Sequence, residues 1–266
     1  MNTMQPPAGT LIKEWRQRRR MSQLDLALEA EISQRHLSFL ESGRSLPSRE
    51  MVLRLAERLA VPLRQRNQML VAAGFAPIYG ERNLEDDSFK PALAAVELVL
   101  KGHEPYPAIA VDRGWNMVLA NAAVGPLLAG IEDQSLLAPP VNVLRLTLHP
   151  KGLAPRVVNL DEWRNHLIER LKLQIEASAD PALEALEKEL SGYPGRPRGN
   201  GKAYDAAANV AVPLRLRAGD EVLSFISTIT VFGTPLDVTL SEIAIESFFP
   251  ADARTGELLR ALASGG

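Results

Sequence analysis

The chain has 266 residues, enough for one large domain or two modest ones, and its 46% hydrophobic and 23% charged residues are ordinary for a folded protein. The absence of cysteine excludes disulfides and thiolate chemistry and favours a reducing compartment, so we expect a cytoplasmic protein. No apolar run approaches the roughly 18 residues of a membrane span, and the N-terminus has no basic start followed by an apolar core, as a secretory signal would.

Charge is distributed unevenly along the chain. Residues 1–76 carry 12 Lys and Arg against 7 Asp and Glu, whereas the remainder carries 18 against 25. A basic first part joined to an acidic second part favours a polyanion such as double-stranded DNA as the partner of the first part, unless the charges cluster by chance. We therefore predict three segments: a domain over 1–76, a linker over 77–90 and a second domain over 91–266.

Helical periodicity predicts five short helices in residues 1–76, with Ser22, Ser33 and Ser48 as N-caps. The second helix is expected to bury Leu24, Ala27 and Leu28. The second and third helices have the close spacing of a helix-turn-helix unit, in which the second helix of the pair enters the major groove of DNA and its N-terminal residues reach the bases.

The start of the third helix therefore holds the candidate base contacts. Gln can pair with adenine, Arg with guanine, and an aromatic ring can touch the methyl group of thymine. Further polar side chains and the amides near Gly43 would hold phosphates. The candidate DNA-binding residues are Gln23, Ser33, Gln34, Arg35, His36, Phe39 and Arg44. Other roles remain open: the arginines of 16–20 face solvent or phosphate, His36 is a plain surface residue, or Phe39 packs on the fourth helix or a partner chain.

The stretch SQLDLALEAEISQRHLSFLESGRSLPS resembles the Cro/repressor type of helix-turn-helix, the Xre class, and the resemblance covers residues 8–76. One position departs from the family pattern. Glu31 stands in the turn where the family usually has glycine, and a left-handed residue other than glycine costs about 1 kcal/mol there. A negative charge near the phosphates is unusual, and it leaves two readings open, a somewhat altered turn or weakened DNA binding.

The second domain alternates helices and strands. Helices are predicted over 91–101, 141–148, 160–177 and 181–190, with a mobile loop over 191–202, where GRPRGNGKA departs from the spacing of a phosphate-binding loop. Strands are predicted at 107–111, 115–120, 221–233 and 242–249, and Asn121 is expected to cap a helix running to 128. The expected sheet is antiparallel, with one apolar face covered by helices and a polar face carrying Thr228, Thr230, Glu242 and Glu246.

This half resembles the ligand-binding domain of MmyB-like transcription regulators, a PAS-like module, through VDRGWNMVLAN, NVLRLTLHPKGLAPRVVNLDEWRNHL and VFGTPLDVTLSEIAIESFFPAD. The resemblance implies an α+β protein and a homodimeric bacterial regulator whose second domain takes a fatty-acid-like or other small apolar ligand. No other cofactor and no metal site is expected. Such a ligand would lie between the apolar sheet face and its helices, near Trp115, Met117, Leu119, Leu144, Arg145, Leu148, His149, Phe225, Ser227, Ile229 and Ile245. Of these, Arg145, His149 and Ser227 would meet a polar head, while the apolar residues are otherwise plain core.

The favoured function is a sequence-specific DNA-binding transcription regulator that responds to this ligand. The alternative is a DNA-tethered module that binds another protein and has no pocket. Enzymatic activity is not expected, because no two of the four histidines have metal-ligand spacing and Ser191 lacks the upstream glycine of a nucleophile elbow. A lipid-processing enzyme would need activity that depends on His149.

Overall fold

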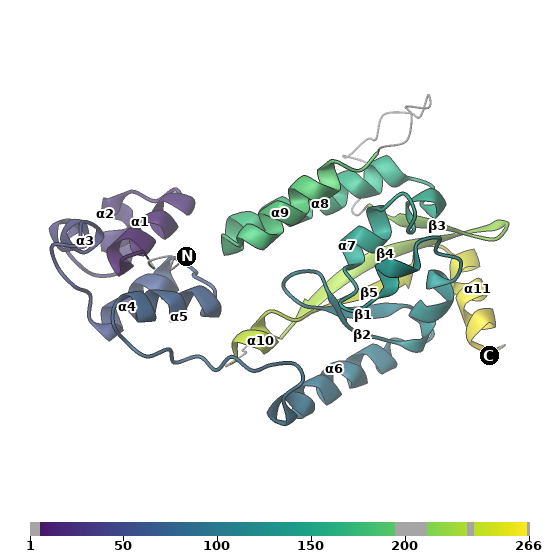
Figure 1. Cartoon of the computed structure of the whole chain (residues 1–266), viewed down its shortest axis with the longest axis horizontal. Helices are drawn as coiled ribbons and strands as arrows, with labels where there is room; N and C mark the ends of the chain where they lie inside the picture. Colours follow the sequence, from purple (N-terminus) through teal and green to yellow (C-terminus); the bar gives the residue numbers. More distant parts are fainter. Residues whose placement is uncertain (1–5, 195–211, 233–236, 265–266) are drawn as a thin grey trace. The chain divides into compact units, whose positions relative to one another are not determined.

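The computed structural model describes residues 6–194, 212–232 and 237–264, and the chain forms two compact units. The first is built mainly from residues up to Glu81 and the second mainly from Arg82 onward (Figure 1). No helix in these described ranges is long and apolar enough to cross a membrane. Most of the loop expected over 191–202 lies outside the described residues.

The first unit contains five helices, as predicted: α1 (Ala8–Arg18), α2 (Gln23–Glu29), α3 (Gln34–Glu41), α4 (Arg49–Arg58) and α5 (Leu63–Ala72). The N-cap predictions are confirmed, since the Oγ atoms of Ser22, Ser33 and Ser48 each accept a hydrogen bond from the backbone N–H three residues later, at 3.1, 3.1 and 3.2 Å. Each cap satisfies a donor that the first helical turn leaves without a partner.

The helices of the first unit pack around one apolar core. The prediction that Leu24 and Leu28 are buried is wrong: they are 50% and 68% exposed. In a helix of seven residues only one stripe faces the core, and Leu26 and Ala27 occupy it. Helices α1 and α3 approach closely at Gly9, where a Cβ atom would lie 2.1 Å from a backbone oxygen of α3.

A buried ion pair joins α1 to α3. Arg16 donates from Nε and Nη2 to the two carboxylate oxygens of Glu41, at 2.6 and 2.9 Å, and from Nη1 to the carbonyl of Met21 at 2.8 Å. Burial alone would raise the pKa of Glu41, but hydrogen bonds from Arg16 and Gln23 outweigh it and lower this pKa. Arg16 is only 8% exposed, so it is not one of the solvent-facing arginines of α1.

The second unit is built on a five-stranded antiparallel sheet in the order β2-β1-β5-β4-β3. Its strands are β1 (Ala108–Val111), β2 (Met117–Ala120), β3 (Leu214–Ala218), β4 (Glu221–Val231) and β5 (Ala244–Pro250). Its α-helices are α6 (Lys90–Gly102), α7 (Val143–Leu148), α8 (Leu160–Ser178), α9 (Pro181–Ser191), α10 (Val238–Ser241) and α11 (Ala253–Ser264). The 3-10 helices are η1 (Asp87–Phe89), η2 (Ala122–Leu128), η3 (Gln134–Leu137) and η4 (Ala154–Arg156).

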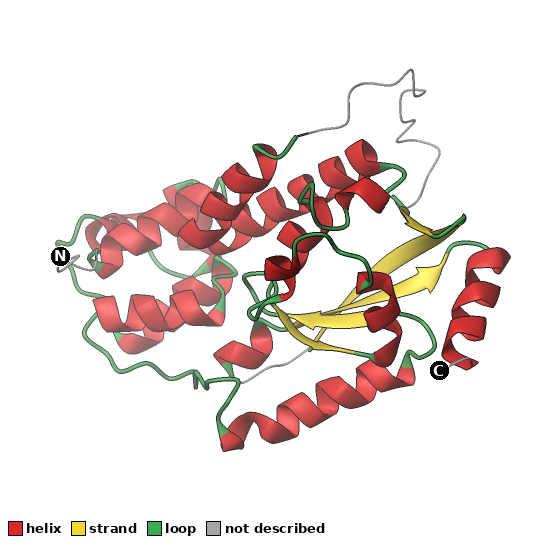
Figure 2. Ribbon diagram, turned by 45° about the vertical axis from the view of Figure 1, so that its right-hand side comes forward, coloured by secondary structure: helices red, strands yellow, loops and turns green. Residues whose placement is uncertain are grey.

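Apolar clusters pack on both faces of this sheet, so the prediction of a single covered face is wrong (Figure 2). The predicted polar face is present in part, since Thr228 and Thr230 of β4 are exposed. One face, which we call the inner face, carries Phe225 and packs against the cluster that contains α7, α8 and α9. The other carries Ala110 and Ile245 and packs against α6. Because side chains alternate along a strand, Glu246 belongs to the inner face, where it is 4% exposed and receives a 3.0 Å hydrogen bond from Arg170.

Asn121 has a different role from the one predicted. Its side chain makes no helix cap. Instead Nδ2 donates to the carbonyls of Leu100 and Tyr106, at 3.1 and 2.8 Å, while Oδ1 accepts from the amide of Ala108 at 3.1 Å. A buried amide that reaches three backbone groups fixes the start of β1 against the end of α6.

Candidate functional site

The turn between α2 and α3 is tight and uses the unusual residue seen in the sequence. Glu31 has φ of +56°, the left-handed conformation that favours glycine. The amide of the next residue, Ile32, donates to the carbonyl of Ala27 at 2.9 Å and closes the turn. Glutamate therefore holds a left-handed conformation that glycine would adopt without strain, at a conformational cost.

The first turn of α3 presents polar side chains to solvent. Ser33, Gln34 and Arg35 are exposed, and His36 and Phe39 are half-buried. The ring of Phe39 lies beneath two guanidinium groups, 5.3 Å from that of Arg35 and 5.7 Å from that of Arg44. Cation–π contact on one aromatic ring holds two arginines at neighbouring places on the surface, one from α3 and one from the segment after it.

Two of the predicted phosphate contacts have partners within the chain. Gln23 donates from Nε2 to a carboxylate oxygen of Glu41 at 2.8 Å, which ties its amide to the buried ion pair. The amides of Gly43 and Arg44 donate to carbonyls of α3 at 3.1 and 2.9 Å, closing the helix with Gly43 at φ of +72°. The prediction that these amides hold phosphates is therefore wrong, whereas the Arg44 side chain is exposed.

The second unit contains an apolar cavity of about 80 Å³ on the inner face of the sheet. Its walls come from β1, β2, β3, β4 and β5, from η2, and from α7 and the segment after it. Apart from the hydroxyl of Thr147, which donates to its own helix at 2.7 Å, the lining side chains are apolar. The lining residues are Pro107, Ile109, Met117, Val124, Leu127, Leu128, Val143, Leu146, Thr147, Leu153, Leu214, Leu216, Phe225 and Phe248.

Of the apolar residues predicted to contact a ligand, Met117 and Phe225 line this cavity. Leu119 and Ile245 were placed wrongly, because strand register puts them on the opposite face with α6. The others do not line it: Ile229 is 47% exposed, Ser227 shares the inner face without reaching the cavity, and three residues are buried in the surrounding core. Those three are Trp115, Leu144 and Leu148.

The two predicted head-group contacts on and after α7 belong to a separate polar cluster. Arg145 binds Glu189 of α9 through three hydrogen bonds of 2.8 to 3.1 Å, and these bonds lower the pKa of Glu189. Tyr193 donates to the same carboxylate at 2.6 Å, and burial together with this bond raises the pKa of Tyr193 to about 12. His149 contacts the Tyr193 ring edge-on at 5.2 Å. Since its charge is neutralised by Glu189, Arg145 is a poor receptor for a ligand.

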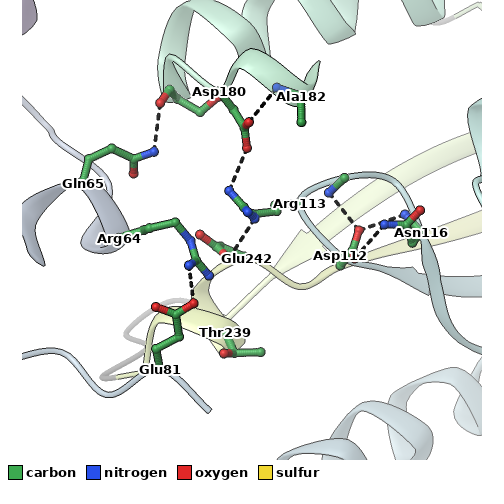
Figure 3. Close-up of polar contacts among 12 residues, drawn as sticks. Arg64, Gln65, Glu81, Asp112, Arg113, Asn116, Asp180, Ala182, Thr239 and Glu242 are labelled. Atoms are coloured by element: carbon green, nitrogen blue, oxygen red, sulfur yellow. Dashed lines mark hydrogen bonds and ion pairs between the residues drawn. The ribbon is translucent and has the colours of Figure 1, made fainter. Parts of the chain in front are cut away.

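Trp115 is held by the turn between β1 and β2. Asp112 accepts from the amides of Gly114 and Asn116, both at 2.8 Å, and Arg113 forms ion pairs with Asp180 at 2.7 Å and with a second carboxylate, that of Glu242 (Figure 3). Trp115 follows this turn with φ of +65°, an uncommon value for a bulky residue. Its indole N–H donates to Gln174 at 2.7 Å, and the guanidinium of Arg170 lies 4.3 Å from its ring. The residue positions α8 over the sheet.

A thin wall separates the cavity from a second hollow. The 3-10 helix η2 turns Val124, Leu127 and Leu128 toward the cavity, while its residues Ala122, Ala123 and Pro126 line a surface pocket of about 340 Å³ next to α11. Most of the cavity-lining residues were missed from the sequence. Alternation argued against Phe248, because it lies two residues from Glu246, which the sequence pattern assigned to the polar face. Neither η2 nor β3 has a pattern that places it beside the sheet's inner face.

Comparison with known families agrees with this geometry. A model described as the MmyB-like transcription regulator ligand binding domain matches residues 93–262, and a helix-turn-helix model matches residues 12–65. The chain belongs to the MmyB-like transcription regulators. This MmyB-like regulator combines a DNA-binding helix-turn-helix with a ligand-binding domain, and both matched families are domains of transcription regulators rather than enzymes. No curated protein gives a significant sequence match.

Proposed function

We propose that this MmyB-like regulator acts in the cytoplasm as a homodimer that binds a specific DNA sequence, and that a small apolar molecule of the fatty-acid class binds its second domain and alters DNA affinity. The observation that carries the proposal is the pairing of two features. One is an exposed cationic surface at the start of α3, and the other is an almost purely apolar cavity in the matched ligand-binding domain.

For DNA, the supporting geometry is the exposed start of α3. Arg35 and Gln34 are exposed side chains of the types that pair with guanine and adenine in the major groove. Arg44 lies beside Phe39, where it can reach a phosphate. In a dimer, two such helices would occupy half-sites one helical turn apart, about 34 Å.

A mobility-shift titration on the DNA upstream of the protein's own gene tests this. Replacing Arg35 with Ala is expected to weaken specific binding by about tenfold to a hundredfold, since a bidentate base contact is worth roughly 1–3 kcal/mol of discrimination. The matched control is Arg58→Ala, which removes an exposed arginine from the end of α4. Equal affinity of Arg35→Ala and the wild type would refute the assignment of α3 as the recognition helix. Inserting half a helical turn between half-sites is expected to abolish dimer binding.

For the ligand, the cavity is smaller than the roughly 300–1,000 Å³ of typical ligand pockets, so its walls must separate to admit a guest. The wall best suited to move is η2, because another hollow lies directly behind it. Mass spectrometry of a denatured extract of the purified protein should reveal a bound apolar compound, and decanoic acid should raise the melting temperature of delipidated protein.

The small volume also favours one alternative, a DNA-tethered module whose second domain binds another protein. In that case the cavity is only an imperfection in the core. No copurifying apolar compound and no melting shift with decanoic acid would support this alternative over a ligand sensor.

A further inference from the structure

Helix α6 covers one face of the sheet, and its own outer side is apolar as well. Leu98 and Val99 are 73% and 46% exposed, although both side chains are large and apolar. The exposed uncharged residues of this side recur at helical spacing, and we call them the α6 face: Pro91, Ala94, Ala95, Leu98, Val99 and Gly102. A helix whose outer side faces only water normally carries charged residues there, so a continuous apolar stripe is typical of a helix that contacts a partner.

The charged side chains of α6 lie together on one flank of the helix. They follow one another at intervals of seven and four residues, which stacks them on one side: Lys90, Glu97 and Lys101. The opposite flank carries Val99 and, four residues later, His103, whose ring centroid lies 4.6 Å from that of Phe249 on β5. The apolar surface of α6 therefore continues toward β5, and the charged flank is turned away from it.

The sheet beside α6 presents a matching surface. Ile226 of β4 pairs with Phe249 of β5, and both belong to the face that carries Ile245 and packs against α6. They are 39% and 42% exposed, and Thr228 and Thr230 of the same face are exposed and uncharged. We call Ile226, Thr228, Thr230 and Phe249 the β4–β5 shelf, since in the sheet order these two strands lie next to β1 and β2, the strands beside α6 (Figure 1).

We infer that a second copy of this chain covers both surfaces. The α6 face of each copy packs on the β4–β5 shelf of the other, and the two α6 helices lie side by side between the two sheets. A helix next to a shelf is complementary to the same pair turned by a twofold axis, as an isologous interface requires. Both surfaces lack charge, and the charged flank of α6 stays in water. The inference rests on the proposed homodimer and names the surface that forms it.

The contact areas also favour a twofold pair. The 13 residues of α6 make a helix about 20 Å long and, with side chains, about 10 Å wide. Packed on one shelf, such a helix would bury roughly 400 Å² counted on both surfaces. Two such contacts, together with the contact between the helices, approach the roughly 1,000 Å² that a stable interface needs, whereas one contact alone is too small.

The test is sedimentation velocity of the full-length protein over a range of concentrations. The wild type is expected to dimerise, and Leu98→Glu and Ile226→Glu should each weaken the dimer by about a hundredfold or more, because a carboxylate would be buried without a partner. Both side chains are exposed in the single chain, so the melting temperature of the monomer should change little. Leu173→Glu, the same substitution at an exposed leucine of α8, is the matched control and should dimerise like the wild type.

The absence of cysteine from the chain allows a second test. In Val99→Cys each copy carries a single thiol, so a short bismaleimide can link only two copies to one another. The two helices lie side by side in the inferred dimer, so Val99→Cys is expected to give a covalent dimer on a denaturing gel. Leu173→Cys, on the helix that covers the inner face, is expected to remain monomeric on the same gel.

The outcomes separate the interface from the proposed homodimer. If the wild type dimerises and either glutamate variant keeps the wild-type affinity, the inference is overturned while the homodimer stands. A wild type that is monomeric at every concentration overturns both. Should a glutamate variant fail to fold, the covalent link decides: no linkage of Val99→Cys, or equal linkage of Leu173→Cys, overturns the inference.

Discussion

The buried ion pair between α1 and α3 should determine whether the recognition helix is held in place. We consider Glu41→Gln, which preserves shape but removes the charge opposite Arg16. The two side chains are only 3% and 10% exposed, so the loss of one partner leaves a cation without compensation in a poorly solvated place. Breaking such a pair costs roughly 3–5 kcal/mol, and because the amide oxygen still accepts one hydrogen bond we expect about 3 kcal/mol.

The measurement is amide hydrogen exchange at pH 7 in the peptide that covers α3, which gives the opening free energy of this region separately from the second unit. Glu29→Gln, an exposed position on α2, serves as control and should stay within about 0.5 kcal/mol of the wild type. Replacing both partners with apolar residues, as in Arg16→Met combined with Glu41→Leu, should recover most of the loss. An opening free energy for Glu41→Gln equal to the control's would refute the reasoning.

Lowering the pH should reduce the loss of stability caused by Glu41→Gln. Hydrogen bonds in the folded state lower the pKa of Glu41 below its ordinary value of 4.5, so the stabilisation is fully present above that pH. It is lost as pH falls through the lower folded pKa, where protonated glutamate resembles glutamine. Thermal unfolding followed by circular dichroism from pH 7 to pH 3 should therefore show the wild type and Glu41→Gln converging, and a constant difference would contradict the assignment.

Three further substitutions test other features. Gly9→Ala should lower the melting temperature and weaken DNA binding because its Cβ would meet α3 at 2.1 Å, whereas Gly102→Ala, with nothing within 4 Å, should not. Glu31→Gly should stabilise by about 1 kcal/mol in urea unfolding by relieving the left-handed backbone, and equal stability would contradict that strain. Burial and, to a smaller extent, the charge of Arg170 lower the pKa of His166 below 6.5. The free energy of unfolding should therefore fall as the pH drops from 7 toward this lowered pKa, because the unfolded chain binds the proton more readily. The substitution His166→Gln should flatten this decline, and an unchanged pH profile of stability would refute the assignment.

The helix-turn-helix could be predicted from the sequence in detail because its signals are local. Serine caps, the apolar stripe and Gly43 each act within one helical turn, so the five helices and the outward direction of Arg35 follow from neighbouring residues. What local pattern could not show was pairing at a distance. Arg16 looked like one of several surface arginines, and only the approach of α3, 25 residues away, buries it against Glu41.

In the second domain the sequence by itself determined that there would be an antiparallel sheet with helices, because alternation and helical periodicity are properties of each segment. Which face each strand turns to the cavity was decided by register, since a shift of one residue moves every side chain to the other face. The sequence therefore predicted Ile245 at the cavity, whereas the structure places Phe248 there. The placement of η2 and Arg156 beside β3 likewise depends on contacts between segments some 60 to 90 residues apart, and such contacts exist only once the chain has folded.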